Sequence, residues 1–92
     1  MENITYTRIE KESISTLSFK KELELDQNSD LIDRLKKASV LGNIHHSKVI
    51  IYFLDDDNPK KVETTIWAVG TKFICLKGGV WIPISNIVDI EF

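Results

Sequence analysis

The residues of this chain that could do chemistry are few and lie apart from one another. His45 and His46 are adjacent just before a run of apolar residues, and Asp55–Asn58 forms an acidic cluster just after it. Adjacent side chains on an extended backbone point to opposite faces, so the two histidines do not chelate one metal ion as a pair. The acidic cluster lacks the spacing and the distal glutamate of an EF-hand loop. We therefore expect no metal site and interpret the cluster as a solvated turn.

No catalytic or cofactor motif accompanies these residues. The chain contains no nucleophile elbow, Walker loop or dinucleotide fingerprint. The pair Gly78-Gly79 is not followed by the start of a helix, as a phosphate-binding loop would be. The single cysteine, Cys75, lies in an apolar run and is expected to be a small buried side chain. We expect neither enzyme activity nor a cofactor.

Two tryptophans are better candidates for a function. Trp67 falls on the face opposite the aliphatic residues in the alternating segment Lys60–Val69, and Trp81 does the same in Val80–Ile84. Tryptophan is enriched where proteins contact their partners. Either the helix or the N-terminal segment covers these two rings, or they form a contact surface.

Lysines near the tryptophans open an alternative for this surface. Ammonium groups could contact phosphates while bases stack on the indole rings, as in proteins that bind single-stranded RNA. The formal net charge of −2 counts against nucleic acid as the partner. The sequence thus predicts a non-enzymatic module for protein–protein contact or self-association, with single-stranded RNA binding as the alternative. The candidate binding residues are Trp67, Trp81, Lys60, Lys61, Lys72 and Lys77.

The elements that must position these residues are mainly strands. Short runs that are rich in β-branched residues, or that alternate between polar and apolar, are separated by turn residues. Gly78-Gly79 predicts a two-residue hairpin, Ser85-Asn86 a single 3₁₀ turn, and Pro83 an edge or bulge position, because proline has no N–H. The predicted strands are Lys48–Leu54, Lys60–Val69, Phe73–Lys77, Val80–Ile84 and Ile87–Phe92.

One helix precedes the strands. Ser29 or Asp30 can cap its start, and Gly42 and Asn43 tolerate the left-handed conformation that ends a helix. Between these limits an apolar stripe predicts about three turns. The stripe consists of Leu31, Ile32, Leu35, Ala38 and Leu41.

The segment before the helix is the hardest to assign. Residues 1–28 are expected to be an N-terminal segment that is partly irregular or mobile, and residues 29–92 a single domain. Ile4–Ile9 alternates weakly, as a strand would, and Ser13–Ser18 is typical of an irregular link. Leu17–Leu25 fits a strand and a helix equally well.

Length and composition set the remaining limits. Ninety-two residues suffice for one domain with a modest core. A single cysteine is typical of a reducing compartment. The first twenty residues carry charges throughout and have no apolar stretch, so we expect no secretory signal, no membrane segment and a cytoplasmic location.

A helix followed by five short strands, with Gly78-Gly79 and the sequence Ile82–Ile87 before the last strand, resembles the Sm-like and SH3-like small barrels. Segments Leu41–Asn43, Val62–Trp67, Leu76–Gly79 and Ile82–Ile84 also resemble a group of short bacterial proteins of unknown function. The bacterial Rho-binding antiterminators are similar in arrangement and bind a protein. Sm rings that bind RNA do so through two short loop motifs. Lys77-Gly78 matches one of these motifs only superficially, and Gly70–Lys72 does not match the other. The resemblance implies a mainly β (α+β) fold, an N-terminal helix followed by a five-stranded, strongly bent antiparallel barrel.

Overall fold

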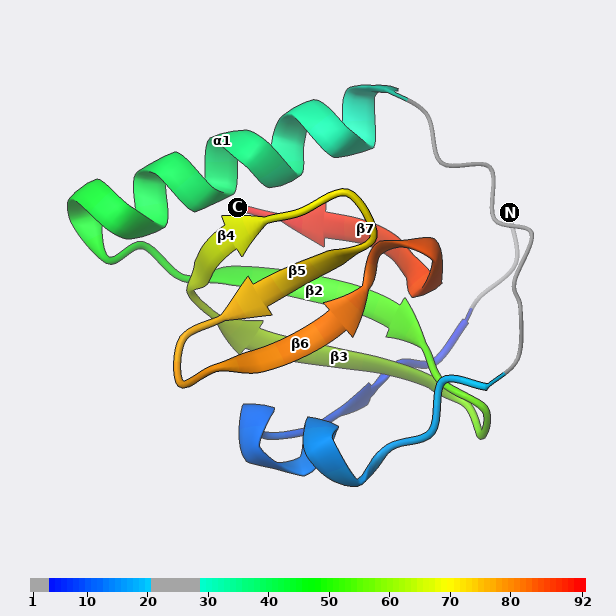
Figure 1. Ribbon diagram of the computed structural model, residues 1–92. Coiled ribbons are helices and arrows are strands. Elements are labelled where there is room, and N and C mark those ends of the chain that lie inside the picture. Colours follow the sequence, from blue (N-terminus) through cyan, green and yellow to red (C-terminus); the bar gives the residue numbers. More distant parts are fainter. Residues whose placement is uncertain (1–3, 21–28) are drawn as a thin grey trace.

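The computed structural model describes residues 4–20 and 29–92, which form two β-sheets and one long helix. Figure 1 shows the helix α1 (Ser29–His45) lying across the top of the two sheets, with β4, β5 and β6 in front of β2 and β3. The short 3₁₀ helices are η1 (Lys11–Thr16) and η2 (Ile84–Asn86). The strands are β1 (Thr7–Arg8), β2 (Val49–Leu54), β3 (Pro59–Thr64), β4 (Ile66–Val69), β5 (Phe73–Leu76), β6 (Val80–Pro83) and β7 (Ile87–Glu91).

The strands divide into a four-stranded sheet, in the order β1-β3-β2-β7, and a three-stranded sheet, in the order β4-β5-β6. β1 runs parallel to β3, and all other neighbours are antiparallel. β2 is the central strand of its sheet, and its side chains alternate between buried and half-buried along the whole strand. Alternation of this kind commits one face of the sheet to the core.

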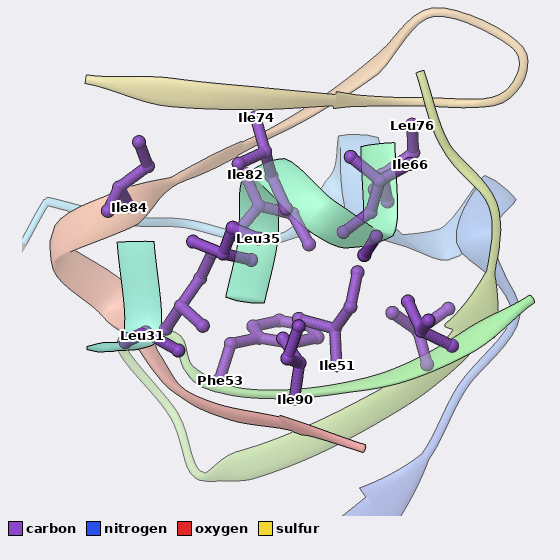
Figure 2. Close-up of a cluster of buried hydrophobic side chains, with 14 of the residues drawn as sticks. Leu31, Leu35, Ile51, Phe53, Ile66, Ile74, Leu76, Ile82, Ile84 and Ile90 are labelled. Carbon is purple, nitrogen blue, oxygen red and sulfur yellow. The ribbon is translucent and has the colours of Figure 1, made fainter. Parts of the chain in front are cut away.

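The core fills the space between the sheets and below the helix. Figure 2 shows Ile74 and Ile82 of the three-stranded sheet reaching toward Ile51 and Phe53 of the other sheet, with Leu35 of α1 between them. These five side chains are fully buried. Since each aliphatic or aromatic side chain contributes about 1.5–3 kcal/mol when it leaves water, this cluster holds the sheets and helix together.

The predicted five-stranded, strongly bent barrel is wrong. The structure has seven strands in two separate sheets, and the predicted strand Lys60–Val69 is divided at Thr65 into β3 and β4. At that point the chain passes from one sheet to the other. The carbonyl of Thr65 accepts a hydrogen bond from the N–H of Lys77 (2.9 Å), outside the β3 ladder. The remaining four predicted strands are confirmed to within one residue at each end.

The open edges of the two sheets are partly covered by side chains of α1. Asn43 and Ser39 donate hydrogen bonds from Nδ2 and Oγ to the carbonyl of Trp67 in β4, at 3.0 and 3.2 Å. Arg34 donates to the carbonyl of Ile90 in β7 at 3.1 Å and pairs with Asp89 at 2.7 Å. Covering an edge satisfies backbone groups that would otherwise be available to pair with another chain.

The predicted end of the helix is also wrong. α1 continues through Gly42 and Asn43 to His45, and His46 adopts the left-handed conformation (φ 55°) that ends it. The N–H of His46 donates to the carbonyl of Gly42 at 3.0 Å, as in an αL cap. Gly42 serves another purpose: a Cβ atom at this position would lie 2.7 Å from the carbonyl oxygen of Ile66, so glycine allows the helix to approach β4 closely.

The N-terminal residues 4–20 pack against the sheets. Only Thr7–Arg8 of the predicted Ile4–Ile9 strand is a strand, and most of the predicted link Ser13–Ser18 lies in η1. Ile14 is 2% exposed and belongs to the core. The ring of Phe19 lies 6.0 Å from that of Phe53, centroid to centroid. Leu17–Lys20 is neither helix nor strand, and the rest of the ambiguous segment lies outside the described residues.

The hairpin between β5 and β6 differs in detail from the prediction. Its turn has three residues, Lys77–Gly79, and both glycines have positive φ angles (94° and 83°) that glycine adopts without strain. Pro83 ends β6, which is an edge strand, as its missing N–H predicts. The predicted 3₁₀ turn at Ser85-Asn86 is confirmed as η2.

Candidate functional site

The outer face of the three-stranded sheet carries large aromatic side chains. In β5 and β6, alternation directs Ile74 and Ile82 into the core, and it directs Phe73 and Trp81 away from it. Trp81 lies opposite Cys75 in the ladder, and Phe73 lies opposite Pro83. The sheet therefore has one aliphatic face and one aromatic face.

Trp67 joins this face through an irregularity in β4. The register between β4 and β5 shifts between Ile66 and Ala68, so that Trp67 and Ala68 together oppose Cys75. A bulge of this kind redirects side chains and increases the local twist. The backbone of Trp67 is fixed to α1, because its carbonyl accepts the two hydrogen bonds from Ser39 and Asn43 described above.

We call Trp67, Phe73 and Trp81 the aromatic face. Trp67 and Phe73 are each 45% exposed and Trp81 is 55% exposed, so the helix covers neither tryptophan. The rings of Phe73 and Trp81 meet edge to face, with centroids 6.5 Å apart and planes at 88°. Aromatic rings prefer this arrangement, which orders both side chains in the free protein.

The four candidate lysines do not all accompany the aromatic face. Lys72 precedes β5 and Lys77 follows it, and both are exposed. Lys60 and Lys61 lie in β3, in the other sheet. Lys60 is buried, and its ammonium donates to Asp55 at 2.6 Å and to Asn58 at 2.8 Å. The structure therefore brings Lys72 and Lys77, and not the other two, to the sheet that carries the tryptophans.

The acidic turn is not simply solvated, as the sequence predicted. Asp55 is buried, and its Oδ1 atom accepts the N–H groups of Asp57 and Asn58, both at 2.9 Å. Burial alone would raise the pKa of the Asp55 carboxyl. The hydrogen bonds from Lys60 and from the two backbone N–H groups outweigh this effect and lower the pKa below its ordinary value. This arrangement stabilises the turn between β2 and β3.

Within the part of the chain that the structure describes, two other side chains have a shifted pKa, and each has a structural partner. The hydroxyl of Tyr52 donates to Glu91 at 2.8 Å, and this hydrogen bond raises the pKa of Tyr52. The hydrogen bond from Arg34 to Asp89 raises the pKa of the guanidinium. Because each shift is explained by a bond between structural elements, these shifts do not mark an active site.

Three further residues considered in the sequence, His45, His46 and Cys75, do not belong to the aromatic face as defined above. His45 and His46 are exposed at the end of α1. Cys75, which the sequence predicted to be buried, is only half-buried, with its Sγ atom 3.6 Å from the carbonyl oxygen of Leu76. Within residues 4–20 and 29–92, no group of three or more histidine, cysteine, aspartate or glutamate side chains is placed to hold a metal ion.

A cavity beside the aromatic face could not have been found from the sequence. It has a volume of about 490 Å³. Three separate segments form it: the first turns of α1, the β4–β5 turn and the end of β6 with η2. In Figure 1 the β4–β5 turn and η2 lie below the start of α1. Phe73 belongs both to the aromatic face and to this cavity. The lining residues are Ile32, Thr71, Lys72, Phe73, Pro83, Ile84 and Ser85.

Comparisons of the chain with models of protein families, with curated proteins and with solved structures found no match. The resemblance to short bacterial proteins of unknown function and to the Rho-binding antiterminators therefore stays a prediction. In the part of the chain that the structure describes, no helix is both long and apolar enough to cross a membrane.

Proposed function

We propose that this chain is a non-enzymatic binding module whose aromatic face contacts a protein surface, either a partner protein or a second copy of the chain. The observation that carries the proposal is the exposure of Trp67, Phe73 and Trp81 on one face of one sheet. Tryptophan is among the residues that dominate the binding free energy of interfaces.

The size of the aromatic face supports this proposal. Three aromatic side chains that are each about half exposed present roughly 300 Å² of mainly apolar surface. Patches of this size on a monomer often mark a site of interaction. The edge-to-face contact between Phe73 and Trp81 also lowers the entropic cost of ordering these rings on binding.

The chain itself allows the first test. Light scattering over a range of micromolar concentrations measures self-association of the wild type and of Trp81→Lys, which places a charge in the aromatic face. If the second copy is the partner, the wild type associates and the variant stays monomeric. A monomer in both cases removes self-association and leaves a different protein as the partner.

Capture from a nuclease-treated native lysate then tests for a different protein. The immobilised wild type is compared with Trp81→Lys and with Val88→Lys, a matched control whose exposed side chain lies on β7 in the other sheet. A protein that is retained by the wild type and by the control, but not by Trp81→Lys, supports the proposal. Identical retention by all three contradicts it.

Single-stranded RNA is the second candidate for the same face. The observation in its favour is that Lys72 and Lys77 are exposed at the two ends of the strand that carries Phe73. Bases could stack on the rings while the ammonium groups contact phosphates. Oligo-U and oligo-A, titrated at low and at moderate salt, test this alternative: binding that weakens steeply with salt supports it, and no binding at low salt eliminates it.

A further inference from the structure

The cavity below the first turns of α1 has the properties of a small-molecule site. Its volume of about 490 Å³ falls in the range of roughly 300–1,000 Å³ that is typical of ligand pockets. Its apolar lining comes from Ile32, Phe73, Pro83 and Ile84. A ligand with an apolar body is therefore expected to displace water from this surface favourably.

The polar side chains of the lining indicate the charge of the ligand. Thr71 contributes a hydroxyl group, and Lys72 is the one charged side chain among the described residues of the lining. The hydroxyl of Ser85 already donates to the Oδ1 atom of Asn86 at 3.1 Å. The ammonium of Lys72 has no hydrogen bond or ion pair within the described part of the chain, whereas Lys60 is fully engaged by Asp55 and Asn58. An ammonium next to an apolar surface favours an anion as its partner.

The two described acidic residues at the start of α1 do not pair with Lys72. Asp30 and Asp33 lie on the same helix as Ile32, but neither lines the cavity. Asp30 pairs with Arg34 at 3.1 Å, one helical turn further along. Among the described residues, the lining therefore combines apolar surface, the hydroxyl group of Thr71 and one positive charge without a carboxylate.

We propose that this cavity binds a small amphipathic anion, with its apolar body against Ile32, Phe73 and Ile84 and its carboxylate at Lys72 and Thr71. The site is distinct from the aromatic face, because only Phe73 belongs to both. Occupancy is expected to alter the environment of Trp81, since the Phe73 ring contacts the Trp81 ring edge to face.

The test uses the full chain carrying Trp67→Phe, so that Trp81 is the only tryptophan. Its fluorescence is titrated with hexanoate, octanoate and 1-octanol, and calorimetry on the wild type provides an independent measure of binding. Octanoate should bind more tightly than 1-octanol. Each methylene that enters the cavity should tighten binding by about fourfold, so octanoate should exceed hexanoate by about fifteenfold.

Two lysine variants separate this proposal from general charge effects. Lys72→Ala should weaken octanoate binding by about tenfold while leaving the affinity for 1-octanol unchanged. Lys77→Ala removes an exposed lysine at the other end of β5, outside this cavity, and should change neither affinity.

The contradicting outcomes are equally specific. Three results would overturn the proposal. Octanoate does not bind, it binds no more tightly than 1-octanol, or it binds Lys72→Ala as tightly as the wild type. A further variant, Ile32→Trp, fills the cavity from the helix and should abolish binding of both probes, with circular dichroism confirming that the variant folds. Trp81→Lys, which tests protein contact through the aromatic face, does not remove a lining residue, so the two proposals can fail independently.

Discussion

Lys60 and Asp55 form a buried ion pair across the turn between β2 and β3. The Nζ atom of Lys60 lies 2.6 Å from the Oδ2 atom of Asp55, and the two side chains are only 10% and 2% exposed. The other carboxylate oxygen accepts two backbone N–H groups, and the ammonium also donates to Asn58. Both charged groups have therefore replaced water with partners of good geometry.

Removing one member of this pair should destabilise the protein. Lys60→Met leaves the Asp55 carboxylate buried without its positive partner, and breaking a buried pair from one side typically costs about 3–5 kcal/mol. We expect the free energy of unfolding in urea to fall by about 3 kcal/mol. Lys61→Met, at the next position of the same strand, should change it by no more than about 0.5 kcal/mol. A loss of less than about 1 kcal/mol for Lys60→Met would contradict this expectation, because it would mean that the pair contributes no more to stability than an exposed ion pair does.

The same pair should make stability depend on pH in the acid range. The pKa of Asp55 is lower in the folded state, so its stabilising contribution is complete above the unfolded value of about 3.9 and is lost as pH falls through the folded value. The difference in unfolding free energy between wild type and Asp55→Asn should therefore be constant from about pH 7 to pH 5 and should shrink below about pH 4. Asp57→Asn, at an exposed position in the same turn, serves as the control. A difference that stays constant down to pH 2 would contradict the assignment.

The burial of Lys60 could have been predicted from the sequence. It has the same parity as Val62 and Thr64, the inward residues of β3, so alternation alone directs its side chain toward the buried face. A lysine at such a position requires an acidic partner, and Asp55 lies five residues earlier across a tight turn. The charge of Lys60 made this residue a candidate for phosphate contact, whereas its inward position in the strand indicated a buried ion pair.

Other features depend on contacts between distant segments. Local alternation located the strands because each half-buried strand carries its own period-two pattern. The pattern continues through Thr64 and Thr65, so it gave no sign that the chain changes sheets there. Gly42 is compatible with a helix end and with a close contact, and only the position of Ile66 decides between them. The cavity could not be predicted because its lining combines Ile32 of α1 with residues 71–73 and 83–85, which lie far from it in the sequence.

Gly42→Ala tests the close approach of the helix to β4. Alanine is the better helix former, by about 1 kcal/mol, but its Cβ atom would lie 2.7 Å from the carbonyl oxygen of Ile66 and 2.8 Å from the Cγ2 atom of Thr65. Because backbone at the contact cannot move as easily as the end of a side chain, we expect a net loss of about 2 kcal/mol and a fall in Tm of about 10 °C. Lys36→Ala, on the exposed side of α1, should leave Tm nearly unchanged or raise it slightly. Stabilisation by Gly42→Ala would mean that the helix and β4 separate without cost.

Ile14→Ala tests whether the N-terminal residues are part of the folded unit. Ile14 is 2% exposed, and truncating a buried isoleucine typically costs about 2–5 kcal/mol. We expect a single cooperative transition with a lower midpoint in urea, because Ile14 shares its core with strands of both sheets. Ile4→Ala, at a position that is 50% exposed, should leave the midpoint unchanged. An unchanged midpoint for Ile14→Ala would show that the segment contributes little to stability.

Trp81→Ala should separate binding from stability. The side chain is 55% exposed and its ring contacts Phe73 edge to face, so truncation should lower the free energy of unfolding by no more than about 1 kcal/mol. At the centre of an interface the same truncation typically costs at least about 2 kcal/mol of binding, or roughly thirtyfold in Kd for the captured partner or for the homodimer. Val88→Ala, on the other sheet, should change neither quantity. A Trp81→Ala variant that loses several kcal/mol of stability would show that the ring supports the fold, and equal affinity for wild type and variant would exclude the aromatic face as the contact surface.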